Sequence, residues 1–507
     1  MADNDAAASA SDQRPTGGSN GKTGEAAPSK PEPVEDIVER SHTLAIGRRK
    51  LPYTSRAGRV VLREEVIEDG KLMGHRPRAT VFLTSYTLDK ADKRTRPVVF
   101  AFNGGPGSSS VWLHMGLLGP RRVVSGDAGS LVPPPYDLVD NHESLLQHAD
   151  LVFIDPVATG YSRGVDGEKH GEYLGFKRDL ESVGEIIRLW TSRNDRWMSP
   201  KFLAGESYGT LRAAGLAAHL QERHGMYLNG IILVSAVLDL SSIQAGEGNE
   251  RPYALFLPTY AAIANYHGKH GERPLEDVLA EANGYAADDY PRLLALGDRI
   301  TPRERQAAIR KVAALTGLSR DYVDRVDLRV EHLRFFTELL RDRRQVVGRL
   351  DGRFVGWEPD GGREHLTADP SGTAMAGPYT AAFNHYVRDE LGYENDLPYE
   401  ILSYAAHEAW SYKEFEGKPV AVINRLGEAM RANPHLRVHV ASGWYDGATP
   451  YFATEHVMAH VPIPEELRGN IEYTYYPAGH MMYVHEPSRV QQSADLAGFV
   501  ARASGGG

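Results

Sequence analysis

A serine between two glycines stands in the pentapeptide G-E-S-Y-G at residues 205–209. The apolar run 201–204 precedes it, and an alanine- and leucine-rich segment follows it to about Leu220. This layout predicts a strand, a sharp turn and a helix, with Ser207 at the turn. A serine hydroxyl raised on such a turn can act as a nucleophile when a base lies within hydrogen-bond reach. A pattern with three fixed positions also occurs by chance in surface turns, so the interpretation depends on the rest of the chain.

The base and the acid that such a serine needs are available on two loops near the end of the chain. Asp446 follows a predicted strand at 438–441, and His480 follows a predicted strand at 471–476. The turn resembles the nucleophile elbow of α/β-hydrolases, where the acid and then the histidine follow the serine, each after a strand. We therefore predict a catalytic triad of Ser207, Asp446 and His480. Taken alone, Asp446 could be one of many surface aspartates and His480 is one of 20 histidines, so the prediction rests on their occurring together.

A glycine-rich loop, Asn103–Gly107, follows the apolar run 97–102. α/β-hydrolases use a loop at this point to supply one oxyanion donor, and the residue after the nucleophile supplies the other. We assign the two donors to the backbone N–H groups of Gly105 and Tyr208. A phosphate-binding loop is the alternative, but no G-K-[ST] follows and the spacing is not G-x-G-x-x-G.

The elements that must position these residues alternate between buried strands and amphipathic helices. Short β-type runs between about His42 and Leu88 predict antiparallel strands at the edge of a sheet. Continuous apolar runs predict strands that are buried on both faces. They lie at 97–102, 151–154, 201–204, 231–234, 438–441 and 471–476, with helices at 176–192 and 487–502. This alternation predicts the α/β class, a mostly parallel doubly wound sheet of the α/β-hydrolase fold.

The alternation stops between residues 239 and 400, where the sequence is mainly helical and rich in charge. A block of this length is too long for a loop between neighbouring strands. We predict an inserted lid at 239–400, between core segments at 36–238 and 401–507. Residues 1–35 have almost no large apolar side chain, so we predict a disordered N-terminal tail.

Composition excludes several classes of protein. The formal net charge of −10 argues against a nucleic-acid partner, and no apolar run approaches the ~18 residues of a membrane span. The chain has no cysteine, which excludes disulfides and a cysteine nucleophile. Without a recognisable signal peptide at the start of this sequence, we expect a cytoplasmic protein.

Five motifs together resemble the serine carboxypeptidases, peptidase family S10, and the chain looks like a bacterial-type member. They occur in order as N-G-G-P-G-S-S-S at 103–110, D-P with G-Y-S at 155–162, G-E-S-Y-G at 205–209, G-W-Y-D at 443–446 and G-H-M at 479–481. The resemblance implies release of single residues from the C-terminus of peptides by the predicted triad. It also implies that Asn103, Gly104 and Glu206 bind the terminal carboxylate of a peptide substrate, without metal or organic cofactor.

Two other functions remain open: an esterase or acyltransferase that uses the same triad, and a binding protein that has kept the fold without activity. The segment that reads E-L-G-P in many members is Leu117-Leu118-Gly119-Pro120 here, so Leu117 replaces an acid near the carboxylate site. Burial by Leu117 would raise the pKa of Glu206 and loss of the acidic neighbour would lower it. His456 and His460 have a spacing that can bind metal, but no H-E-x-x-H pattern accompanies them, and we interpret them as surface histidines.

Overall fold

The computed structural model describes residues 32–505 of the 507-residue chain. Of the predicted tail, residues 1–31 lie outside the described residues, and 32–35 contain neither helix nor strand. Among residues 32–505, no helix combines the length and the apolar character needed to span a bilayer.

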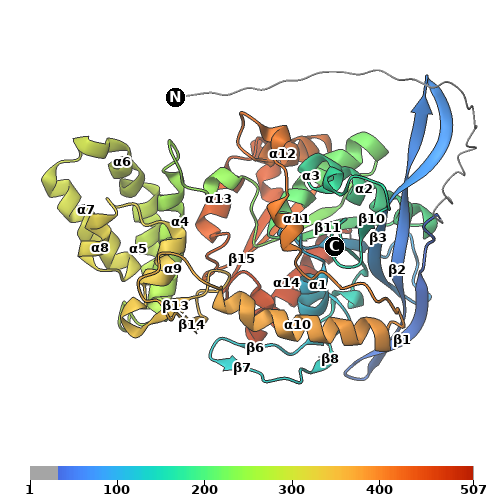
Figure 1. The fold of residues 1–507 in the computed structure, drawn as a ribbon, viewed down its shortest axis with the longest axis horizontal. Helices are drawn as coiled ribbons and strands as arrows, with labels where there is room; N and C mark the ends of the chain where they lie inside the picture. Colours follow the sequence, from blue (N-terminus) through green and yellow to red (C-terminus); the bar gives the residue numbers. More distant parts are fainter. Residues whose placement is uncertain (1–31, 506–507) are drawn as a thin grey trace, which may run out of the picture.

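A sheet of ten strands runs through the molecule (Figure 1). Six of them, in the order β9-β4-β11-β12-β15-β16, are parallel, and β1, β2, β3 and β10 add an antiparallel edge. The doubly wound, mostly parallel sheet predicted from sequence is therefore confirmed. The strands are β1 (Val38–Ile46), β2 (Arg49–Glu68), β3 (Lys71–Leu88), β4 (Val98–Phe102), β9 (Asp150–Ile154), β10 (Arg163–Gly164), β11 (Lys201–Glu206), β12 (Gly230–Val234), β15 (Arg437–Gly443) and β16 (Ile471–Tyr476).

The central strands are buried on both faces because helices cover each side of the sheet. In β4, Val98 and Phe100 face one hydrophobic cluster while Val99 and Ala101 face another, as the two-residue period of a strand requires. The first cluster includes α2 (Phe176–Arg193), α3 (Tyr208–His224) and α12 (Ile423–Ala432); the second includes α1 (Val111–Leu113), a π-helix at His114–Leu118 and α14 (Glu486–Ala503).

The segment between β12 and β15 contains most of the remaining helices. Those from α4 to α9 form a lobe with a hydrophobic cluster of its own, seen at the left of Figure 1. They are α4 (Arg251–Tyr266), α5 (Leu275–Ala287), α6 (Asp289–Leu296), α7 (Pro302–Thr316), α8 (Arg320–Arg325) and α9 (His332–Glu338). Helix α7 begins at a capping box formed by Thr301 and Glu304. The division into a core at 36–238 and 401–507 and a lid at 239–400 stays a prediction.

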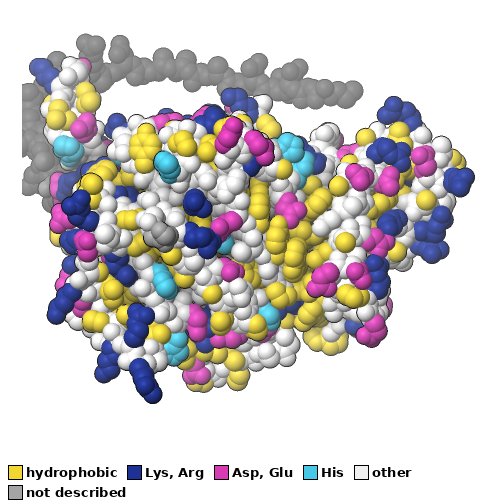
Figure 2. All heavy atoms as spheres, turned by 180° about the vertical axis from the view of Figure 1, so that it is seen from behind, with side chains coloured by type: hydrophobic (Ala, Val, Ile, Leu, Met, Phe, Trp, Pro, Cys, Tyr) yellow, Lys and Arg dark blue, Asp and Glu magenta, His cyan; other side chains and the backbone are white. Residues whose placement is uncertain are grey.

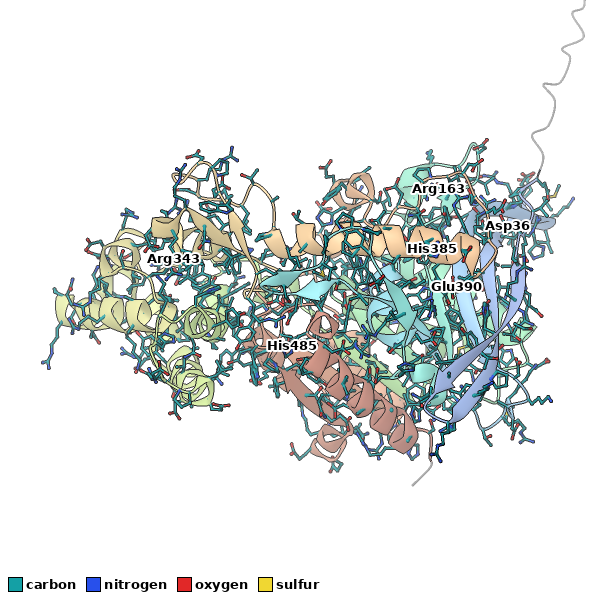
Figure 3. All side chains as sticks on the ribbon, turned by 90° about the horizontal axis from the view of Figure 1, so that it is seen from below. Asp36, Arg163, Arg343, His385, Glu390 and His485 are labelled. Carbon is teal, nitrogen blue, oxygen red and sulfur yellow. The ribbon has the colours of Figure 1, made fainter. Side chains whose placement is uncertain are left out.

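Helix α10 (Pro370–Asp389) belongs to the same inserted segment but packs on the sheet. Its buried side chains, among them Tyr379 and Tyr386, join the cluster that covers one face of the sheet. Seen from below, α10 runs from the lobe towards the antiparallel edge, with His385 and Glu390 near its far end (Figure 3). There Glu390 pairs with Arg121 at 2.8 Å and the Tyr393 hydroxyl donates to Asp36 at 3.0 Å.

The lobe meets the rest of the molecule along helix α13 (Tyr451–Ala459). An apolar cavity of about 520 Å³ lies here, lined by α4, α6 and α13 residues such as Leu255, Leu294 and Phe452. From behind, hydrophobic side chains gather between the lobe and the larger part of the molecule (Figure 2). One helix and six short strands complete the described helices and strands outside the 3₁₀-helices. They are α11 (Tyr404–Glu408), the pairs β5 (Arg121–Val123) with β8 (Leu138–Asp140) and β6 (Gly126–Asp127) with β7 (Ser130–Leu131), and the hairpin β13 (Gln345–Val347) with β14 (Val355–Trp357), described below.

Candidate active site

Ser207 lies at the sharp turn between β11 and α3. Its backbone angles, φ 59° and ψ −130°, are a strained combination for a residue with a side chain. The turn leaves no room at Gly205, where a Cβ would approach the Gly209 oxygen to 2.1 Å. The Ser207 N–H donates to the Val234 oxygen at 3.0 Å, and the Thr210 hydroxyl donates to the Ser207 oxygen at 2.6 Å. These contacts set Ser207 above the first turn of α3, as the sequence predicts.

The predicted acid and histidine meet on the loops after β15 and β16. Both are buried, and His480 Nδ1 lies 2.8 Å from Asp446 Oδ2. The N–H groups of Ala448 and Thr449 donate to Asp446 Oδ1 at 2.8 and 2.9 Å, and the Thr449 hydroxyl donates to Oδ2 at 2.7 Å. Because a carboxylate only accepts, Nδ1 carries the imidazole proton and Nε2 is left as the base.

Electrostatics in this pair favour the charged forms. Burial lowers the pKa of His480, but the charge and hydrogen bond of Asp446 outweigh burial and hold that pKa above its ordinary value. Burial raises the pKa of Asp446. The charge and hydrogen bond of His480 and the hydrogen bonds of Thr449 lower it by more, so this pKa is below its ordinary value. Asp446 can thus stabilise the imidazolium that forms when His480 takes a proton.

Ser207 and the histidine loop are brought to the same edge of the sheet. Glu206, directly before Ser207, is close enough to His480 for each charge to shift the pKa of the other. The Ser235 hydroxyl, just after β12, donates to the His480 main-chain oxygen at 2.6 Å. Within residues 32–505, no hydrogen bond joins Ser207 Oγ to the imidazole; such bonds are often long before substrate binds.

The glycine-rich loop after β4 lies directly against the nucleophile turn. A Cβ at Gly104 would approach the Tyr208 nitrogen to 2.4 Å, so only glycine permits this contact. The predicted oxyanion donors, Gly105 N–H and Tyr208 N–H, therefore belong to two segments in contact. Tyr208 is the first residue of α3, where the N–H has no partner within the helix and the helix dipole favours negative charge.

A buried arginine, which the sequence did not reveal, joins these two segments. Arg212 of α3 is 1% exposed, donates to the Asn103 oxygen at 2.6 Å and pairs with Asp179 at 2.8 Å. Its guanidinium also lies over the rings of Phe102 and Tyr208, 5.3 and 5.5 Å from their centroids. These contacts fix the glycine-rich loop relative to α3.

Glu206 is buried and accepts two hydrogen bonds. Asn103 Nδ2 donates to Oε1 at 2.8 Å, and the Tyr483 hydroxyl donates to Oε2 at 2.7 Å. Burial raises the pKa of Glu206 to about 7, against the opposing effects of His480, Tyr483 and Asn103. The direction that sequence left open is therefore upward.

Tyr483 is the second residue that sequence reasoning missed. It stands three positions after His480, and nothing in that spacing indicates a contact with Glu206. Leu117, which occupies the position of the family acid, is 1% exposed and belongs to the hydrophobic cluster under the sheet. Beside it, a Cβ at Gly116 would lie 2.4 Å from the Tyr483 ring and 2.5 Å from the Tyr379 hydroxyl.

The remaining candidates lie away from this cluster of contacts. The rings of His456 on α13 and of His460 just after it are 4.5 Å apart, and the described part of the chain holds no group of three metal-ligating side chains. Asp155, from the D-P motif, accepts bonds from the Ser110 N–H and hydroxyl at 2.8 and 2.7 Å. His485, labelled in Figure 3, lies directly before α14, five residues after His480.

Comparisons with known proteins relate part of the chain to one family of peptidases. Residues 79–256 match the family model described as serine carboxypeptidase. Serine carboxypeptidase-like 37 of Arabidopsis thaliana is 31% identical over 195 residues, which are 37% of this chain and 38% of that protein. Pheromone-processing carboxypeptidase KEX1 of Yarrowia lipolytica is 31% identical over 154 residues, 30% of this chain and 23% of that protein. The matches thus span about a quarter to two-fifths of these curated relatives.

Similarity to a solved structure extends over much more of the chain. The prohormone-processing carboxypeptidase KEX1(delta)p of Saccharomyces cerevisiae superposes with a TM-score of 0.54 over 89% of this chain and 91% of that one, at 14% identity. This likeness establishes the α/β-hydrolase fold expected from the alternation of strands and helices. The family model, over residues 79–256, and the curated relatives show that this part of the chain is similar to the serine carboxypeptidases, peptidase family S10.

Proposed function

We propose that the chain is a serine-type carboxypeptidase, which releases residues one at a time from the free C-terminus of peptides. The observation that carries the proposal is the buried Glu206 carboxyl, directly before Ser207 and bonded to Asn103 and Tyr483. A carboxyl with a pKa of about 7 is largely protonated at mildly acidic pH. A protonated carboxyl can donate a hydrogen bond to a peptide carboxylate, whereas an ionised one would repel it.

The proposed mechanism passes through an acyl-enzyme. His480 Nε2 accepts the Ser207 proton while Oγ bonds to the scissile carbonyl carbon, and the resulting oxyanion receives hydrogen bonds from Gly105 and Tyr208 N–H. The imidazolium then gives its proton to the leaving amine as the C–N bond breaks. Water attacks the ester with His480 again as base, which releases the shortened peptide and restores Ser207. Asp446 keeps the imidazole in the required tautomer throughout.

Substrate binding is proposed at Asn103, Gly104 and Glu206. An asparagine amide has two N–H donors, and one of those of Asn103 is used by Glu206 Oε1. The second has no acceptor among the described residues and would donate to a carboxylate oxygen of the substrate. Gly104 brings the backbone of its loop against α3 beside the nucleophile, so a carboxylate bound here would lie next to the scissile bond.

Paired peptides test this proposal. One member of each pair ends in a free carboxylate and the other in a carboxamide, and mass spectrometry follows the products at several pH values. We expect one-residue ladders from the free acids, with a rate that falls as pH rises through the pKa of Glu206. Equal cleavage of acids and amides with one pH profile would refute carboxylate recognition.

Two alternatives use the same fold. An esterase or acyltransferase would cleave esters without producing ladders from peptides. A binding protein would fail to react with a fluorophosphonate at Ser207 under native conditions. The labelling experiment therefore tests the nucleophile, and the peptide pairs test the substrate.

A further inference from the structure

The loop of the β13–β14 hairpin, residues 348–354, reaches from the inserted segment to both loops of the predicted acid and base. The Gly447 N–H, next to Asp446, donates to the Arg349 oxygen at 3.0 Å. The His480 N–H donates to the Leu350 oxygen at 2.6 Å, and the Gly352 N–H donates to the Tyr445 oxygen at 2.9 Å. The hairpin lies between the lobe and the body of the molecule in Figure 1.

Asp351, within this loop, contacts Gly479, the residue directly before the histidine. It is 4% exposed, and its Oδ2 accepts from the Gly479 N–H at 3.2 Å. A Cβ at Gly479 would lie 2.4 Å from the Asp351 Cβ, so the two loops are in contact at the residue that precedes His480. Any displacement of Asp351 therefore moves the backbone that carries the imidazole.

Asp351 is itself fixed by a buried ion cluster. Arg353, 6% exposed, donates to the Asp351 carboxylate at 2.6 and 3.0 Å and pairs with Asp127 of β6 at 3.0 Å. The start of α10 supports the same loop, because Asp369 accepts from the N–H groups of Arg349 and Leu350 and the Ser371 hydroxyl accepts from the Asp351 N–H.

We infer that Asp351 and Arg353 are positioning residues, which hold the His480 loop in register with Asp446. The inference rests on the triad of the proposed function. The inserted segment would then do more than cover the ends of the strands, because it would also hold a catalytic loop in place. A histidine displaced by about 1 Å costs roughly 10²-fold in rate, because proton transfer requires a short, aligned hydrogen bond.

Displacement also has an electrostatic signature. The charges that act on His480 are Asp446 and Glu206, which raise its pKa, and Arg349, which lowers it, in addition to burial, which lowers it. If the imidazole moves away from Asp446, its pKa falls, and the acid limb of kcat/KM moves to lower pH. Loss of stability alone changes the amount of folded enzyme but not this limb.

Hydrolysis of an uncharged ester provides the test, because it requires the triad and no carboxylate recognition. Rates are expressed per reactive serine, counted by fluorophosphonate labelling. We expect Asp351→Ala to lower kcat by about 10²-fold, Asp351→Asn by less, and both to move the acid limb to lower pH. Arg353→Gln should act in the same direction, although removal of its positive charge alone would raise the pKa of His480.

Asp150→Asn is the matched control. Asp150 is 3% exposed, pairs with Arg96 at 2.6 Å and with Arg196, and accepts from the Leu88 N–H, but it lies at the opposite end of the parallel strands. It should lose stability without a change in kcat or in the acid limb. If Asp351→Ala does not fold, Asp351→Asn and Arg353→Gln provide the same measurement.

Unchanged kinetics in the Asp351 and Arg353 variants, or an equal loss in Asp150→Asn, would overturn the inference while the unmutated enzyme still reacts with fluorophosphonate. Failure of the unmutated enzyme to react would refute the proposed function, and the inference with it.

Discussion

The hydroxyl of Tyr483 is the contact through which the proposed carboxylate site can be tested most sharply. It donates to Glu206 Oε2 at 2.7 Å, and this donation lowers the pKa of Glu206 against the effect of burial. Tyr483→Phe keeps the ring and removes the donor. A hydrogen bond to a charged group contributes about 1.5–3 kcal/mol. Since one pKa unit corresponds to about 1.4 kcal/mol, the pKa of Glu206 should rise by roughly 1–2 units from about 7.

Only the protonated form of Glu206 can bind a carboxylate, and this decides in which direction the pH profile should move. Activity on free-acid peptides is then present below the Glu206 pKa and lost as pH rises through it. Tyr483→Phe should move this alkaline limb of kcat/KM to higher pH by roughly 1–2 units. Hydrolysis of an uncharged ester should keep its profile, because no carboxylate has to be bound.

Tyr379→Phe is the matched control for this measurement. Tyr379 is a buried phenol whose pKa is raised by burial and by Glu206, but it makes no hydrogen bond to that carboxyl within residues 32–505. Its loss should leave the alkaline limb in place. The reasoning is refuted if Tyr483→Phe leaves the limb unmoved or shifts it to lower pH, or if both variants shift it equally.

Three further predictions concern the nucleophile, the acid before it and the buried arginine. Ser207→Ala and His480→Ala should each lower kcat by about 10⁴-fold, and the double variant little more, so multiplicative losses would contradict a triad. Because the folded-state pKa of Glu206, about 7, exceeds its ordinary 4.5, stability falls as pH rises between these values. Glu206→Gln should remove this loss, about 3 kcal/mol by pH 8, as read from urea unfolding at pH 4 and 8. Arg212→Met should destabilise by about 3–5 kcal/mol because it leaves Asp179 buried and unpaired, and Asp179→Asn in the same chain should recover part of the loss.

The sheet could be predicted because burial on both faces leaves a continuous apolar run in each central strand. The run at 471–476 coincides with β16, and the others differ from the observed strands by a few residues. The lengths of β2 and β3 could not be predicted in the same way. Beyond Leu62, the hairpin extends past the core, its exposed tip carries Ile67, Leu72 and Met73, and no alternation of apolar residues marks it. Sequence therefore showed only the buried half of this hairpin.

Helix α10 illustrates a different limit. Its sequence is helical and apolar on one side, like the helices of the lobe, and it follows them along the chain. Only the structure shows that Tyr379 and Phe383 pack on the sheet instead of joining the lobe's cluster. Which surface an amphipathic helix covers is decided by tertiary contacts that its own pattern does not contain.

Some residues of the candidate site could be recognised from local sequence, and others could not. Ser207, Asp446 and His480 and the loop at 103–107 were recognisable because local turns and strand ends give them fixed sequence surroundings. Tyr483, Arg212 and Asp351 were not, since each acts on a partner that is distant in the chain. Their contacts with Glu206, Asn103 and Gly479 depend on how four separate segments meet at the strand ends.

The exchange of an acid for Leu117 changes what surrounds Glu206. A second acid would share a proton with Glu206 and so stabilise its protonated form, as two carboxyls in contact do. Tyr483 instead donates to the carboxylate and favours ionisation, while burial opposes it. The balance leaves the pKa at about 7, higher than an exposed glutamate but within reach of neutral pH. A carboxylate site built on one buried acid and one phenol should therefore bind free-acid peptides from acidic pH up to about neutrality, and the phenol sets where that range ends.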